Sequence, residues 1–267
     1  MGLVKNSIPV GEPSGPFDTV FVSSQLALGP VPWTIQWLPA VDSTQDLVRE
    51  AAGAGAQEGL TVVTDWQRQG RGRLGRQWVT APGHDLLFSV LLRPGRTMLS
   101  LLPLLAGIAV ADGLKQATGL AIDLKWPNDL LFDGRKLAGI LLERGPEPAA
   151  ALGVGVNVNS GVDELPAQAS SVSLALGRPQ RRETLLVAIL AALGAALQRS
   201  REEGEGWVLP SWRQQSSMLG NRVSYERAGA VTAGVAEDIE DDGALRLRGD
   251  DGKLTRIYAG DVRLLRG

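Results

Sequence analysis

The residues best suited to chemistry lie in a segment at 67–78, which carries three glycines and four arginines in the eleven residues that end at Trp78. Glycines allow positive φ angles and let backbone amides approach a ligand closely. Arginines add planar, permanently charged donors that suit carboxylates and phosphates. A flexible, solvated basic loop would have the same composition, but this segment directly follows a β-branched stretch and ends in tryptophan. We therefore predict an anion-binding loop.

A second segment, Lys-Trp-Pro-Asn-Asp-Leu at 125–130, precedes a further lysine, Lys136, at the start of the apolar stretch 135–141. Pro127 favours an extended backbone at the residue before it, so we expect a bend that orients the Asn-Asp pair. A lysine that enters an apolar strand can extend its ammonium to solvent at an edge. Alternatively, it is a charged group inside a site.

The third segment is Gly-Val-Gly-Val-Asn-Val-Asn at 153–159. A buried strand whose glycines permit close packing would have this pattern. It is not the dinucleotide-binding fingerprint, because no helix follows the glycines, and no glycine loop is followed by the Gly-Lys-Ser/Thr of a Walker A motif.

The composition restricts the chemistry further. The chain has no cysteine and one histidine, His84, so thiol nucleophiles, disulfides and multi-histidine metal sites are excluded. We expect His84 to be a solvated loop residue. With 27 basic and 29 acidic residues, the net charge of −2 disfavours a dedicated nucleic-acid binder. The apolar stretches 99–111 and 185–197 are too short to span a membrane, and the N-terminus lacks the pattern of a signal peptide, so we expect a cytoplasmic protein.

The elements that would position these segments follow from periodicity and turn residues. Ser43 or Thr44 is placed to cap a helix. We expect strands at 60–64, 85–92, 122–132, 136–144 and 152–159, and further helices at 99–118 and 184–199. Short strands separated by Asp-Asp-Gly turns over 222–265 predict a small β-barrel. The predicted organisation is a loosely structured lead-in at 1–32, a catalytic domain at 33–217 and a C-terminal domain at 218–267.

In order and spacing, these segments resemble those of the biotin protein ligases, and Asp-Ser-Thr at 42–44 matches the opening motif of that family. The resemblance covers residues 35–267. It implies an α+β fold: a mixed, mainly antiparallel sheet with helices, as in the class II synthetase-like catalytic domain of biotin and lipoate ligases, followed by a small SH3-like β-barrel. Because the lead-in is too short for a winged helix, we expect a ligase without a DNA-binding domain.

The resemblance also implies a reaction. Biotin and ATP with Mg²⁺ would give biotinyl-5′-AMP, from which a lysine of a biotin carboxyl carrier protein domain takes the biotinyl group. Neither step requires cysteine, histidine or a tightly held metal, which fits the composition. We expect no DNA or membrane partner, and a monomer or weak homodimer.

The family pattern assigns roles to residues of this chain. Lys136 and Arg73 are the implied catalytic residues. Asp129 is expected to orient its neighbours, with a contact to magnesium as the alternative. The implied biotin-binding residues are Ser43, Thr44, Gln45, Gln67, Gly70, Arg71, Gly72, Arg73 and Lys136. The implied nucleotide-binding residues are Arg73, Trp78, Lys125, Asn128 and Asn157, and no metal ligand is implied.

Two positions depart from the family pattern, since Gln45 and Asp85 each stand where asparagine is common. Three alternative functions also stay open. A lipoate or octanoyl ligase would share the fold but need an apolar tunnel, which the polar residues Ser43, Thr44 and Gln67 disfavour. A non-catalytic biotin-binding module should have lost Lys136 or a loop arginine. A single-stranded nucleic-acid binder would use the glycine- and arginine-rich loop, against the net charge.

Overall fold

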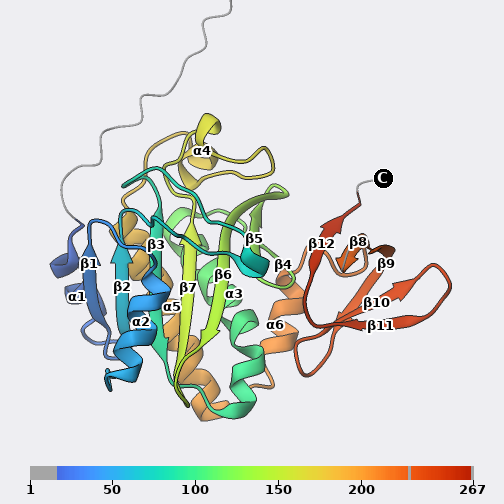
Figure 1. Cartoon of the computed structure of the whole chain (residues 1–267), viewed down its shortest axis with the longest axis horizontal. Coiled ribbons are helices and arrows are strands. Elements are labelled where there is room, and N and C mark those ends of the chain that lie inside the picture. Colours follow the sequence, from blue (N-terminus) through green and yellow to red (C-terminus); the bar gives the residue numbers. More distant parts are fainter. Residues whose placement is uncertain (1–16, 228–229, 266–267) are drawn as a thin grey trace, which may run out of the picture.

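The computed structural model describes residues 17–227 and 230–265, which form a large mixed α/β unit and a smaller C-terminal sheet (Figure 1). The large sheet has the strand order β1-β2-β3-β7-β6-β5-β4. Only β1 and β2 pair in parallel, so the expected mixed, mainly antiparallel sheet is confirmed. Its strands are β1 (Thr34–Leu38), β2 (Leu60–Thr64), β3 (Leu86–Leu92), β4 (Asp123–Lys125), β5 (Asp129–Phe132), β6 (Arg135–Arg144) and β7 (Ala150–Val156).

Helices cover both faces of this sheet (Figure 1). The helices are α1 (Thr19–Leu26), α2 (Thr44–Gly53), α3 (Arg96–Thr118), α4 (Val172–Leu176), α5 (Arg182–Glu203) and α6 (Val208–Gln215). Helix α2 packs on one face through Val48 and Ala52. Helices α3 and α5 pack on the other face, where Phe88 and Val154 belong to the main core. Because both faces are covered, every residue of β3 is buried.

Helices α3 and α5 are each long and apolar enough to cross a membrane by length and composition alone. In this fold their apolar side chains instead form the core. Gly113 of α3 has no room for a Cβ, which would lie 2.6 Å from the Cα of Ile189 in α5. The two helices are therefore in close backbone contact, as buried core helices are.

The expected lead-in is wrong for residues 17–32. Helix α1 begins after Asp18, whose carboxylate accepts a hydrogen bond from the Phe21 amide at 2.8 Å. Val22 and Leu26 are buried in the main core, so this segment is part of the α/β unit. The remainder of the expected lead-in, residues 1–16, lies outside the described residues.

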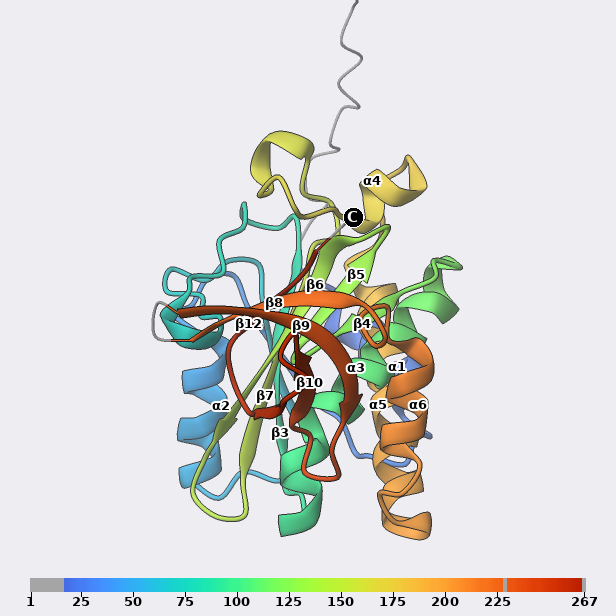
Figure 2. The ribbon, with the colours of Figure 1, turned by 90° about the vertical axis from the view of Figure 1, so that its right-hand side faces the viewer.

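The C-terminal strands differ from the expected barrel. They are β8 (Arg222–Arg227), β9 (Ala230–Ile239), β10 (Leu245–Gly249), β11 (Leu254–Ile257) and β12 (Asp261–Leu264). Their order is β11-β10-β9-β8-β12, all antiparallel, and β11 and β12 do not pair within the described residues. The sheet is therefore open. Figure 2 shows it lying beside the β4 edge of the large sheet.

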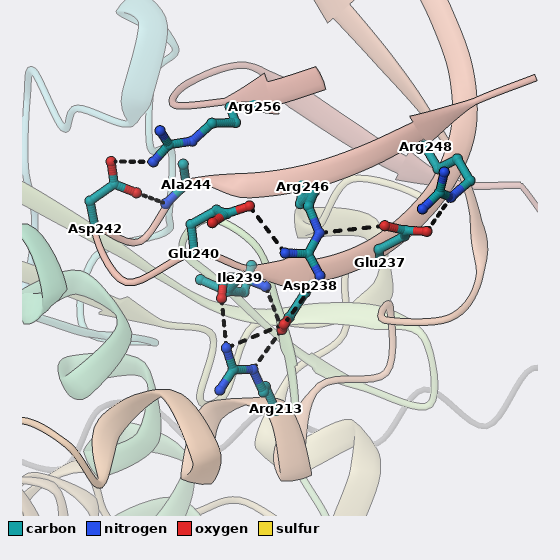
Figure 3. Close-up of polar contacts among 10 residues, drawn as sticks. All are labelled: Arg213, Glu237, Asp238, Ile239, Glu240, Asp242, Ala244, Arg246, Arg248 and Arg256. Carbon is teal, nitrogen blue, oxygen red and sulfur yellow. Dashed lines mark hydrogen bonds and ion pairs between the residues drawn. The ribbon is translucent and has the colours of Figure 1, made fainter. Parts of the chain in front are cut away.

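Ion pairs fasten the C-terminal sheet to the α/β unit (Figure 3). Arg213 of α6 contacts Asp238 of β9, with Nε to Oδ1 at 2.6 Å, and donates from Nη2 to the Ile239 carbonyl at 2.8 Å. Arg246 extends the network, because its guanidinium lies within 3.6 Å of Asp238 and contacts Glu237 and Glu240. These contacts hold the turn that follows β9 against the α/β unit.

Candidate active site

A cavity opens on the α2 side of the large sheet, where the 67–78 loop crosses β7 and β6 (Figure 1). Its floor consists of residues from paired strands, because Gly139 lies opposite Gly155 and Ser89 lies opposite Gly153. All the predicted site residues line this cavity except Gly70 and Asn157. Gly70 lies just behind it and accepts a hydrogen bond from the Trp78 amide at 2.9 Å.

One end of the cavity is polar and uncharged. Gln67 Oε1 accepts from the Thr44 amide at 2.9 Å and from Thr44 Oγ1 at 3.1 Å, and Thr44 Oγ1 lies 2.7 Å from Ser89 Oγ. Since Thr44 occupies Oε1, the amide nitrogen of Gln67 is left for a ligand acceptor. Ser43 is at the N-cap of α2, but its side chain makes no capping bond, so the expected capping role is wrong for Ser43.

Four buried polar atoms of cavity-lining residues have no hydrogen-bond partner among the described residues. They are Ser43 Oγ, Gln45 Oε1, Arg71 Nε and Trp78 Nε1. The other end of the Gln45 amide is held, because Nε2 donates to the Leu141 carbonyl at 3.0 Å. Unpaired buried polar groups are unfavourable unless a ligand or water pairs with them. The cavity is therefore suited to a ligand that carries both donors and acceptors.

The Trp78 indole lies on the glycine floor. A Cβ at Gly155 would lie 2.6 Å from Trp78 Cε2, and a Cβ at Gly139 would lie 2.9 Å from Cζ3. The Lys136 ammonium lies 5.3 Å from the centre of the same ring, within cation–π range. Any side chain at 139 or 155 would thus displace the aromatic residue that closes the cavity.

The other end of the cavity is cationic. Lys136 Nζ contacts Asp129 Oδ1 at 2.6 Å, and Lys125 Nζ lies 3.6 Å from Oδ2 of the same carboxylate. One carboxylate thus faces two ammonium groups. Arg73 adds a third cation, with Nη1 3.5 Å from Asn128 Oδ1. Burial lowers the pKa of Arg73 from its ordinary value, so its guanidinium would gain from an anionic ligand.

Arg71 lines the cavity and also anchors the 67–78 loop to neighbouring elements. Its guanidinium binds both oxygens of Asp46 on α2 at 2.7 Å and contacts Glu143 Oε2 on β6 at 3.1 Å. The hydrogen bond to Asp46 raises the pKa of Arg71, and the same bond lowers the pKa of Asp46. A bidentate pair of this kind is directional as well as strong. The loop is therefore fastened to α2 and to the sheet.

Comparison with known proteins agrees with this geometry. Residues 37–159 match the Biotin/lipoate A/B protein ligase family, and residues 218–265 match the Biotin protein ligase C terminal domain. The chain is 34% identical to the biotin--[acetyl-CoA-carboxylase] ligase of Mycobacterium tuberculosis over 229 residues, which are 83% of this chain and 85% of that protein. The chain belongs to the biotin protein ligase family.

Two further relatives extend the comparison. The bifunctional ligase/repressor BirA of Bacillus subtilis is 32% identical over 84% of this chain and 72% of its own length. The biotin protein ligase of Aquifex aeolicus, solved in complex with biotin and ATP, superposes with a TM-score of 0.75 at 29% identity, covering 88% of this chain and 99% of that chain. The family resemblance in the sequence is thus confirmed in both sequence and fold.

Two residues differ from the expectations, Asn157 from the role that the family pattern implies and His84 from the solvated position expected of it. Asn157 does not line the cavity, because its side-chain nitrogen donates to the carbonyls of Ser170 at 3.0 Å and Lys136 at 3.3 Å. His84 lies in a turn, as expected of a loop residue, but it is partly buried, since its Nδ1 lies 3.0 Å from Glu164 Oε2 and its side chain is 19% exposed. Both side chains instead hold neighbouring backbone segments together.

Sequence reasoning missed several groups around the ligase cavity. Asp46 and Glu143, which hold Arg71, carry no motif and are brought to it only by the fold. The C-terminal sheet contributes Gly260 and Val262 to the lining, and its Gly243 carbonyl accepts a hydrogen bond from Trp126 Nε1 at 3.0 Å. In the sequence, the alternating glycines at 153 and 155 were the one sign that this strand forms a cavity floor against which the Trp78 ring packs.

Among residues 17–227 and 230–265, no cluster of three or more His, Cys, Asp or Glu side chains is placed to hold a metal ion. Asp129, the acidic residue inside the cavity, faces Lys125 and Lys136.

Proposed function

We propose that this chain activates biotin with ATP to biotinyl-5′-AMP and transfers the biotinyl group to a lysine of a biotin carboxyl carrier protein domain. One observation carries the proposal. The Lys136 ammonium lies in the cavity between the Asp129 carboxylate and the Trp78 ring, opposite the uncharged polar end. A molecule with a polar head and a carboxylate tail matches that arrangement.

In the first step, an oxygen of the biotin carboxylate attacks the α-phosphorus of ATP, and the bond to the β-phosphate breaks to release pyrophosphate. Two anions must approach each other, so positive charge at the reacting centre is the main requirement. Lys136 binds the carboxylate and the α-phosphate, and Arg73 binds the phosphate from the loop side. Asp129 keeps the Lys136 and Lys125 ammonium groups in place.

The polar end of the cavity selects the ligand. Ser43 Oγ is buried and has no partner in the described part of the chain, and Gln67 can donate through its amide nitrogen. A ureido ring presents N–H donors and a carbonyl acceptor, which these two groups complement. Gln45 Oε1, also unpaired, accepts a further hydrogen bond at the same end. Trp78 then packs on the bound intermediate over the glycine floor.

In the second step, the acceptor lysine nitrogen attacks the acyl carbon, the bond to AMP breaks, and the amine loses a proton. The mixed anhydride hydrolyses quickly in water, so a loop that covers it protects the intermediate. The Arg71 contacts with Asp46 and Glu143 hold the loop in that covering position. A carboxylase carrier domain is the acceptor, and we place the reaction in the cytoplasm.

The test is ATP–pyrophosphate exchange measured separately with biotin and with lipoate. We expect exchange with biotin and at most trace exchange with lipoate, and avidin-detectable label on a carrier domain. Lys136→Ala should lower biotin-dependent exchange by a hundredfold or more, or about 3 kcal/mol, with an unchanged circular dichroism spectrum. Preference for lipoate would favour the lipoate ligase alternative. Near-normal exchange in Lys136→Ala would remove the assigned catalytic role of this lysine.

A further inference from the structure

The direction of the Lys136 side chain depends on an irregularity in β6. Leu130 of β5 lies opposite Ala138, but the next residue, Leu131, lies opposite Lys136. Leu137 is therefore an extra residue without a partner in β5, which is a β-bulge. In a regular strand, residues three apart point to opposite faces of the sheet.

The bulge places Lys136 on the cavity face. A Cβ at Gly139 would lie 3.2 Å from Lys136 Nζ, so residues 136 and 139 project to the same side although they are three apart. Gly139 belongs to the cavity floor, and without the extra residue Lys136 would project to the face covered by α3. The orientation of the Lys136 side chain toward the cavity thus depends on the stability of the bulge.

Asn157, which follows β7, holds this bulge. Its backbone amide donates to the Leu137 carbonyl at 2.9 Å, and its side-chain Nδ2 donates to the Lys136 carbonyl at 3.3 Å. The same nitrogen donates to the Ser170 carbonyl at 3.0 Å. Asn157 is 6% exposed and does not line the cavity.

The segment 168–170 also holds the backbone of Lys136. The Lys136 amide donates to the Gln168 carbonyl at 2.8 Å, and the Ser170 amide donates to the Lys136 carbonyl at 2.9 Å. Asn157 joins this segment to β6, because one NH₂ group serves both Lys136 and Ser170. The Lys136 carbonyl thus has two donors, the Ser170 amide and the Asn157 side chain, and the Asn157 amide also ties the segment 168–170 to β6.

We propose that Asn157 is a positioning residue, whose side-chain amide holds the β6 bulge so that Lys136 faces the reacting anions, and that it does not contact the nucleotide. The proposal rests on the proposed function, since it concerns the orientation of Lys136. Removing the amide leaves the Lys136 carbonyl with the Ser170 amide as donor, so the strand stays formed while the orientation of Lys136 loosens. The expected effect is on turnover rather than on nucleotide binding.

The experiment is a double-mutant cycle in the full-length chain, followed by ATP–pyrophosphate exchange with biotin. We expect Asn157→Ala to lower kcat by about tenfold to a hundredfold, the range in which small misplacements of catalytic groups fall. The KM for ATP should change less than threefold. In a Lys136→Ala background, Asn157→Ala should cause no further loss, because the residue acts only through Lys136.

The matched control is Asn159→Ala. Asn159 has the same side chain two residues along the chain, but it bonds both backbone groups of Gln180, at 2.9 and 2.8 Å, and has no bond to β6. This variant should keep the wild-type kcat. Asn157→Ser, which retains one donor, should fall between wild type and Asn157→Ala, and it replaces Asn157→Ala in the cycle if circular dichroism shows that variant unfolded.

Two results would overturn the proposal. A rise in the KM for ATP with unchanged kcat would mean that Asn157 binds the nucleotide. Additive losses in the double variant would mean that it acts independently of Lys136. Failure of the proposed function is distinguishable, because Lys136→Ala alone would then exchange pyrophosphate at a near-normal rate, or no biotin-dependent exchange would occur in the wild type.

Discussion

At the scale of single residues, the glycine at 155 determines the position of Trp78. Because a methyl group there would lie 2.6 Å from the indole, we expect Gly155→Ala to displace Trp78 and to reduce the space for biotin above the cavity floor. The KM for biotin should rise by about tenfold to two-hundredfold, the range for one misplaced methyl group in a tight pocket. Titration of pyrophosphate exchange with biotin measures this. Gly206→Ala, where nothing lies within 4 Å of the added methyl group, is the control and should match wild type.

Asp85 gives a prediction about pH. This carboxylate is 1% exposed, and burial raises its pKa although Ser160 and the Val158 amide donate to it. The native state therefore binds the Asp85 proton more tightly than the unfolded chain does. At pH values above the pKa that Asp85 has in the unfolded chain, the free energy of unfolding falls as pH rises, by at most about 1.4 kcal/mol per pH unit. This decrease in the free energy of unfolding ends at pH values above the pKa of Asp85 in the native state.

We expect Asp85→Asn to remove this fall. Urea unfolding of wild type and variant across pH 4 to 8 should show the variant gaining relative stability as pH increases. Parallel curves would show that the Asp85 carboxylate titrates alike in the native and unfolded states.

At the scale of elements, the 67–78 loop is the part whose closure matters for selectivity. Arg73 lies near Asn128 across the cavity, whereas Arg71 fastens the loop to α2. We expect Arg73→Gly to keep adenylation but to release biotinyl-AMP, so that serum albumin in the same reaction becomes biotinylated. Arg68→Ala, which removes an exposed contact with Asp42, should not label albumin. Label confined to the carrier domain, with only a slower rate, would make Arg73 a substrate-positioning residue and contradict the covering role.

The elements also show what the sequence could and could not predict. Strand β2 was predicted with its observed bounds, because a β-branched run is a local signal. The stretch 122–132 was predicted as one strand, but the chain reverses at residues 126–128, so that β4 and β5 form an antiparallel hairpin in which Lys125 lies opposite Asp129. The bend expected at Pro127 was the local signal of this turn, whereas the contacts of Trp126 with Met218 and Gly243 could not be predicted because both residues lie far along the chain. Helix α1 was missed because its apolar residues lack helical periodicity, and Asp18 at its N-cap was the remaining local signal.

The candidate site shows the same division. The loop and both lysines were predicted because their charge and glycine content stand out locally. The proposed positioning role of Asn157 was not predicted, because it depends on the bulge at Leu137 in β6 and on the distant segment 168–170, which packs beside Lys136. The open C-terminal sheet was predicted as a barrel because alternation and turns define strands but not whether the edge strands meet.

At the scale of the whole molecule, Arg213 connects the two units. It bridges α6 to Asp238 and to the Ile239 carbonyl, next to the turn that binds Trp126. We expect Arg213→Ala to lower the free energy of unfolding by about 1–2 kcal/mol, since charged hydrogen bonds are lost, and to reduce turnover at the same time. Urea unfolding and pyrophosphate exchange on the same preparation measure both.

Arg222→Ala is the matched control, because Arg222 pairs with Asp250 within the C-terminal sheet and leaves the connection to α6 intact. It should leave turnover unchanged. If Arg213→Ala lowers stability but not turnover, the C-terminal sheet only covers apolar surface of the α/β unit.

The position of Gly243, Gly260 and Val262 has a consequence for how the protein is made. Gly260 and Val262 line the cavity and the Gly243 carbonyl binds Trp126, yet the ribosome adds these three residues after every other residue of the site. A nascent chain therefore carries the anion-binding loop and Lys136 well before the wall that closes around them exists. We therefore expect biotin activation to begin only once this wall has been synthesised and folded, so that unfinished chains would not release reactive acyl-adenylate beside the ribosome.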